Sequence, residues 1–171
     1  MDAWLILLRI IHVGSAMIWF GGGILASFFL QPTAEALGKS GQPFMDHLVN
    51  RRRMGLFFPI VAGLTILSGA ALYWRDSAGL SITWITSPTG LGFTIGAIAA
   101  ILAFVLGFIL IGPSIAEQTA VQNELARGDR EPTDAQRGRL ERAARRMQLA
   151  NRIDLPLLLV AGLSMAVARY L

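Results

Sequence analysis

Four long apolar segments, nearly free of charged residues, are the feature that most restricts the fold of this chain. They run over residues 3–30, 54–74, 91–111 and 153–170. Crossing about 30 Å of hydrocarbon takes about 20 helical residues, and each segment is near or beyond that length. We therefore expect an all-α fold, a bundle of four transmembrane helices that forms a single integral membrane domain over residues 1–171.

The charges outside these segments predict an orientation. Only Arg9, Arg75 and Arg169 belong to the side that carries the two termini. The other twelve basic residues fall in the first and third loops: Lys39, Arg51, Arg52, Arg53, Arg127, Arg130, Arg137, Arg139, Arg142, Arg145, Arg146 and Arg152. Because cytoplasmic loops carry an excess of Lys and Arg, we expect loops 31–53 and 112–152 in the cytoplasm. Both termini would then lie outside the inner (plasma) membrane of a bacterial cell.

Several classes of function are disfavoured by what the chain contains. Its net charge of +4 reflects membrane topology, so nucleic acid is not an expected partner. It has no cysteine, which excludes disulfides, thiolate nucleophiles and thiolate metal sites. It also lacks a nucleophile paired with a base, a pair of intramembrane carboxylates, a phosphate loop and zinc-ligand spacing. We assign no catalytic residue and do not expect a hydrolase or an ATPase.

The third loop predicts a cytoplasmic helical hairpin that extends the third and fourth helices. The segment 113–127 has few breakers and should continue the third helix as far as Gly128-Asp129. Residues 133–136 have the spacing of a capping box and should start a helix that runs into the fourth span. Pro156 is expected to kink or restart that helix, and Pro59 to bend the second.

The first helix presents two different faces. Bulky aliphatic residues occupy one of them, which should contact lipid. Small and polar residues follow the other at three-four spacing: His12, Ser15, Ala16, Trp19, Gly22, Gly23 and Ala26. Such residues face protein, because helices in hydrocarbon associate through close approach rather than apolar attraction. Similar stripes follow the third helix (Gly92, Gly96, Ala100) and the fourth (Ala161, Gly162, Met165, Ala168), and they predict tight packing or an oligomer.

His12 is the leading candidate for function, since a titratable group well inside a membrane is costly to keep there. As neutral imidazole it could ligate haem iron or copper, and Met165 is expected at a similar depth on an inward face. We assign His12 as the metal ligand, and His12 with Met165 as cofactor-binding residues. A structural His12, hydrogen-bonded to Ser15, Thr65 or Ser68, and a proton-transfer role are the alternatives.

The other two candidates have ordinary interpretations. His47 lies near the Arg51–Arg53 run and is expected to be solvated at the interface. Asp154 is the only acid at a membrane edge on the fourth helix, where capping, or pairing with Arg152 or with the first-loop arginines, is expected in preference to proton relay.

The run Arg9-Ile-Ile-His12-Val-Gly-Ser-Ala-Met-Ile-Trp19-Phe-Gly-Gly-Gly23, followed by Arg51-Arg-Arg-Met-Gly, Pro59 and Gly69, resembles a known pattern. It is similar to small bacterial four-helix membrane proteins of unknown function, and more distantly to CopD-domain copper-resistance proteins and HemJ-type protoporphyrinogen oxidases. Asn151-Arg-Ile-Asp-Leu-Pro156-Leu-Leu-Leu resembles the start of the last HemJ helix. The resemblance implies that His12 is a candidate haem ligand. The Lys and His of the third HemJ helix have no counterpart in 91–111.

Two hypotheses follow for the function. One is a redox or metal-handling membrane subunit in which His12 binds haem b or copper. The other is a non-catalytic scaffold or accessory subunit, whose small-residue faces bind other helices and whose Arg-rich hairpin binds a cytoplasmic partner. The expected partners are the lipid bilayer, anionic lipid headgroups at the Arg-rich loops, and a second copy of the chain or another membrane subunit. A small permease or channel component is a weaker third alternative.

Overall fold

The computed structural model describes residues 2–128 and 131–171, so that Met1, Asp129 and Arg130 lie outside the described residues. Every regular element in these two ranges is helical. Four of the described helices are long and apolar enough to cross a bilayer: 3–36, 54–76, 88–125 and 134–170. The all-α prediction and the count of four apolar helices are confirmed, and the fold is compatible with a multi-pass membrane protein.

The first half of the chain forms two long helices joined by a folded loop. The first is α1 (Ala3–Leu25), which continues through the π-helical turn η1 (Ala26–Leu30) into α2 (Gln31–Ala36). It ends at Ala36, and Gly38 follows two residues later with a positive φ of 55°, which glycine adopts readily. The loop contains η2 (Gly38–Ser40), α3 (Gly41–Asp46) and η3 (His47–Arg51), and α4 (Met54–Asp76) follows.

The second half repeats this plan with longer helices. A short helix, α5 (Ile82–Ile85), precedes α6 (Pro88–Leu106), which continues through η4 (Gly107–Ile111) into α7 (Gly112–Gly128). The last helix is α8 (Asp134–Val167), closed by η5 (Ala168–Tyr170). The predicted capping box is confirmed, because the Thr133 hydroxyl accepts from the Gln136 amide and the Gln136 side chain accepts from the Thr133 amide.

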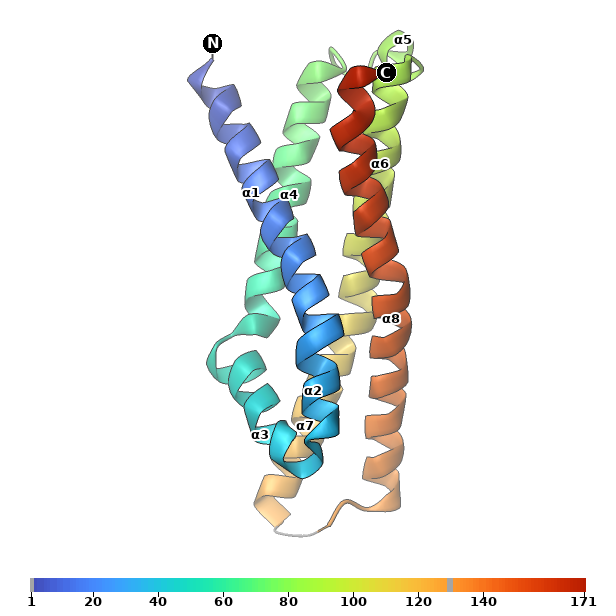
Figure 1. The fold of residues 1–171 in the computed structure, drawn as a ribbon. Coiled ribbons are helices and arrows are strands. Elements are labelled where there is room, and N and C mark those ends of the chain that lie inside the picture. The colour runs from blue at the N-terminus through green and yellow to red at the C-terminus, as the bar shows by residue number, and fades with distance from the viewer. Residues whose placement is uncertain (1, 129–130) are drawn as a thin grey trace.

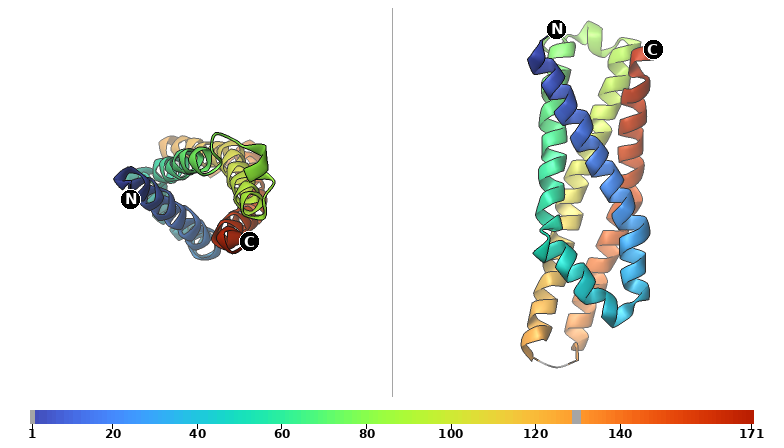
Figure 2. Two further views of the ribbon diagram at one scale, coloured as in Figure 1. Left: turned by 90° about the horizontal axis from the view of Figure 1, so that it is seen from above. Right: turned by 60° about the vertical axis from the view of Figure 1, so that its left-hand side comes forward.

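The four spans pack mainly as two pairs, α1 with α4 and α6 with α8. Figure 1 shows both chain ends at one end of the bundle, while α7 and the first half of α8 project from the other. Helix α1 runs obliquely, beginning beside α4 and approaching α8 in its second half (Figure 2). All four spans meet in one buried cluster of Trp19, Val61, Ala62, Ala103 and Leu158.

Helix α8 runs without interruption from Asp134 to Val167. It does not restart at Pro156, and a kink there stays a prediction. The polar helix that precedes the span enters it directly, and neighbouring helices in a bundle make an internal proline tolerable. Pro59 likewise lies inside the continuous helix α4.

The small-residue stripes of the third and fourth spans pack tightly against each other, a pairing that the sequence left open. Gly162, which was placed in the fourth stripe, is exposed instead. A Cβ atom added at Gly92 would lie 2.8 Å from Ala168 Cβ, and one added at Gly96 would lie 2.6 Å from Met165 Cγ. The two predicted faces of helix one are distinguished by burial, since Ile10, Met17 and Phe28 are exposed while Ser15 and Trp19 are buried.

Beyond the spans, α7 and α8 are joined by charged contacts. The Arg139 guanidinium donates to Glu117 (2.5 Å) and to both carboxylate oxygens of Glu124 (2.8 and 3.0 Å). The side-chain amide nitrogen of Gln136 also donates to Glu124. These bonds join the two helices near their connection, where the side chains are only partly buried.

Candidate cofactor site at His12

His12 lies on the face of α1 that packs against α4 and is half-buried there. Its Nδ1 atom is 2.9 Å from the main-chain oxygen of Thr65. A carbonyl oxygen only accepts hydrogen bonds, so Nδ1 must carry the hydrogen. In the neutral ring Nε2 then keeps its lone pair, which is the state that a metal ligand requires.

Hydroxyl side chains hold the backbone around this bond. The Thr65 hydroxyl, which is buried, donates to Ser15 Oγ at 2.8 Å, and Ser15 in turn donates to the main-chain oxygen of Ile11. The buried Ser68 hydroxyl returns to the main chain at Leu64 and Thr65. Polar side chains in hydrocarbon need such partners, and here they join α1 to α4. We call this set (His12, Ser15, Thr65, Ser68) the polar seam.

Gly69 forms the floor beneath the imidazole. A Cβ atom added there would lie 2.7 Å from His12 Cε1 and 3.0 Å from Nδ1. The ring therefore occupies space that only a glycine leaves free. In the sequence, Gly69 was noted only as part of a family resemblance. Its position one helical turn after Thr65, on the same face of α4, could have indicated this contact.

Met165 lies at a different interface from His12. It packs on α8 against Gly96 of α6, whereas His12 packs on α1 against Thr65 and Gly69 of α4. Within residues 2–128 and 131–171, no group of three or more His, Cys, Asp and Glu side chains could hold a metal ion. The imidazole of His12 thus lies between α1 and α4, and the thioether of Met165 lies between α6 and α8. That the two side chains bind one cofactor stays a prediction.

A cleft of about 430 Å³ opens one helical turn from His12, towards the end that carries the termini. Its lining is Asp2, Leu5, Ile6 and Arg9 from the start of α1 and Arg75 from the end of α4. Leu5, Arg9 and His12 follow one another at helical spacing, so they share a face of α1. Sequence reasoning found Arg9 and Arg75 only as charges on one side, because their meeting depends on how α1 and α4 pack.

Asp154 differs from its predicted role. It is 8% exposed, and its Oδ1 atom is buried without a hydrogen-bond partner. It makes no ion pair with the described residues, so the expected pairing with Arg152 or with the first-loop arginines is wrong. Arg152 projects from the exposed side of α8 instead. One turn away, Asn151 donates to Gln31 Oε1 at 2.8 Å and joins α8 to α2.

His47, by contrast, is exposed in η3, as expected for a solvated residue. The site thus consists of one imidazole with an assigned tautomer, a glycine floor and an arginine-lined cleft along the same helix face. No family model, no curated protein and no solved structure matches this chain.

Proposed function

We propose that this protein is a multi-pass subunit of the bacterial inner membrane that binds a metal-centred redox cofactor through Nε2 of His12. The observation that supports this most is the bond from Nδ1 to the Thr65 carbonyl. Metal-binding histidines commonly donate their second nitrogen to a carbonyl, which fixes the tautomer and the ring orientation. A histidine without such a bond would be free to present either nitrogen.

Haem b is a better candidate than copper. Haem iron is commonly held by a single proximal imidazole, and His12 provides one donor of this kind. Copper(I) sites favour soft sulfur ligands beside imidazole, and Met165, a residue that could supply one, packs at the other helix pair. His12 would supply a nitrogen ligand, and the bound iron would supply one-electron chemistry.

The orientation of the subunit is proposed from charge. Twelve of the fifteen Lys and Arg residues lie in loops 31–53 and 112–152, which favours a cytoplasmic position for both loops. Both termini lie at the opposite end of the bundle (Figure 1), which agrees with four crossings. The projecting α7 and α8 helices would then form an Arg-rich cytoplasmic hairpin that contacts anionic lipid headgroups or a partner.

A visible absorption spectrum tests the cofactor directly. The protein would be expressed with added haem, purified in mild detergent and measured oxidised and after dithionite. We expect a Soret band with reduced α and β bands that disappears in His12→Ala, while the variant still elutes as a folded particle. His47→Ala is the matched control and should keep the spectrum, because His47 is exposed at the other end of the bundle.

A non-catalytic scaffold is the second candidate, and one observation favours it. The polar seam already gives each of its side chains a hydrogen-bond partner, as a purely structural contact between α1 and α4 would. A colourless protein that is folded and contains no copper by metal analysis would reject the cofactor proposal in favour of this one. A spectrum that survives in His12→Ala would reject His12 as the ligand.

A further inference from the structure

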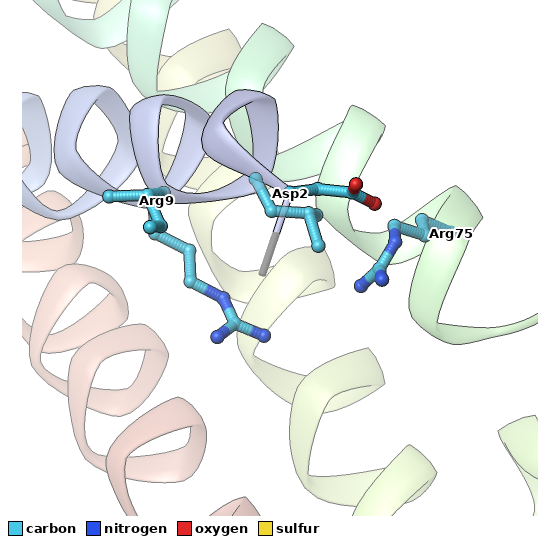
Figure 3. Close-up of a pocket in the computed structure, with 5 residues that line it drawn as sticks. Asp2, Arg9 and Arg75 are labelled. Carbon is cyan, nitrogen blue, oxygen red and sulfur yellow. The ribbon is translucent and has the colours of Figure 1, made fainter.

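Arg9 is the basic residue that lies deepest along α1, and its surroundings are unusual. Figure 3 shows its side chain extending from α1 towards the ribbons of the opposite helix pair, with Arg75 and Asp2 at the other side of the cleft. Arg75 has an acidic neighbour, since its guanidinium lies 3.4 Å from Asp76 Oδ1. Arg9 makes no hydrogen bond or ion pair with any residue in the described ranges.

Arg9 is the guanidinium of this cleft that has no bonded partner among the described residues. Two guanidinium groups face the cleft, and Asp2 is the single acid that lines it. Asp76, beside Arg75, is the next acid along α4. An unpaired guanidinium is costly near hydrocarbon, and it is stabilised by an oxyanion that accepts two parallel N–H bonds. The cleft therefore favours a ligand with an anionic oxygen-rich group at Arg9.

The apolar residues of the cleft indicate the chemistry of the rest of the ligand. Leu5 and Ile6 are apolar, and Ile6 is 43% exposed on the outside of the bundle. An exposed apolar wall beside two guanidinium groups matches a ligand that has an anionic head and apolar chains. A volume of about 430 Å³ is suited to a headgroup while the acyl chains stay in lipid.

We propose that this cleft, lined by Asp2, Leu5, Ile6, Arg9 and Arg75, binds the phosphate headgroup of an anionic phospholipid. Arg9 makes the principal contact with the phosphate, and Arg75 adds a second positive charge from α4. The bound lipid would fill the side of the bundle where α1 diverges from α8 (Figure 1). This inference does not depend on whether His12 binds a cofactor.

Native mass spectrometry of the full-length protein tests the proposal. The protein would be released from detergent with equal amounts of phosphatidylglycerol and phosphatidylcholine that carry the same acyl chains. We expect preferential retention of phosphatidylglycerol, with about tenfold weaker binding in Arg9→Gln, because charge-assisted bonds to the phosphate are lost. Arg75→Gln should reduce binding less. Arg169→Gln, at the same end of the bundle but outside the cleft, is the matched control and should bind as the wild type.

Three outcomes would overturn the proposal. Equal retention of the two lipids would show that the anionic head is not recognised. An equal loss in Arg169→Gln and Arg9→Gln would show a general effect of surface charge. Displacement of the lipid by inorganic phosphate at the same concentration would show that the ligand is a soluble oxyanion. Arg9→Lys guards against misfolding, since it keeps the charge and should retain part of the lipid preference.

Discussion

The α1–α4 and α6–α8 interfaces bury side chains of opposite kinds. Hydroxyls and an imidazole join α1 to α4, with Ser15 Oγ and Thr65 Oγ1 2.8 Å apart. Between α6 and α8 the contacts are glycine and alanine against backbone, as where a Cβ atom at Gly96 would lie 3.0 Å from the main-chain oxygen of Ala161. We call this second interface, formed by Gly92, Gly96, Ala161, Met165 and Ala168, the small-residue seam.

This difference separates two ways of holding helices together in a membrane. Close approach at the small-residue seam gains dispersion energy, and its glycine and alanine contacts need no directional bonds. Directional bonds at the polar seam fix a tautomer and an orientation, and they leave a nitrogen lone pair on His12. A functional site is therefore expected at the polar seam, while the small-residue seam supplies rigidity.

Gly96→Leu, in the small-residue seam, should cause the largest change in stability. The new side chain would meet Met165 Cγ, Ser164 Oγ and backbone that cannot move aside, so we expect a loss of about 3 kcal/mol in the free energy of unfolding. Unfolding by SDS titration from a mild detergent would measure it. Gly162→Leu on α8 is the control, since no atom lies within 4 Å of a Cβ added there. Equal losses in both variants would contradict the contrast between the seams.

Asp154→Leu should change stability in the opposite direction. Removing a buried carboxylate oxygen that has no partner is expected to raise the free energy of unfolding by about 1–2 kcal/mol. The same SDS titration would show it, with Asp154→Asn as a polar control that gains less. A clear loss of stability in Asp154→Leu would mean that the carboxylate has a stabilising partner, and that α8 also contributes to a polar network.

Thr65→Val sharpens the comparison within the polar seam. It removes the hydroxyl bond to Ser15 but keeps the main-chain oxygen that binds His12 Nδ1. We expect a loss of about 0.6 kcal/mol in stability and an unchanged spectrum of any bound haem. In Ser68→Ala, the control, the lost hydroxyl bonds only to its own helix, and the change should be smaller. A lost spectrum in Thr65→Val would show that the hydroxyl itself positions the imidazole.

Arg139→Met should have the smallest global effect. It removes the bonds to Glu117 and Glu124 between α7 and α8, and partly exposed ion pairs contribute little to overall stability. We expect an unchanged unfolding midpoint but faster amide hydrogen exchange over residues 131–140. Arg145→Met, on an exposed position of α8 with no bond to α7 among those described, should leave the exchange unchanged. A shifted unfolding midpoint would show that this charged contact contributes to overall stability as the buried seams do.

Much of the fold followed from local patterns. Apolar length placed the four spans, and the third helix begins at Pro88, three residues before the predicted start of its apolar segment at 91. Capping chemistry placed the start of α8 correctly, because the Thr133–Gln136 pair is local in sequence. Pro156 does not divide α8, since packing in a bundle compensates for a lost helical bond.

The candidate site was only half predictable. Three-four spacing placed His12 and Ser15 on the inward face of α1, which needs no knowledge of the neighbouring helix. The sequence named Ser15, Thr65 and Ser68 as possible partners of His12, but the atom that binds it is the main-chain oxygen of Thr65, which every residue has and no side-chain pattern selects. The burial of Asp154 likewise depends on which helices surround it. From the sequence only its charge was known, and the charge suggested an ion pair.

By itself the sequence determined the four apolar helices, their inward faces and the excess of basic residues in two loops, because these depend on composition and on helical period. Tertiary structure alone decided that His12 packs on α4 while Met165 packs on α6, and that Arg9 and Arg75 line one cleft. Helices in a bundle can be ordered in several ways with similar burial of small faces. The choice between them is made by close contacts between residues far apart in the chain.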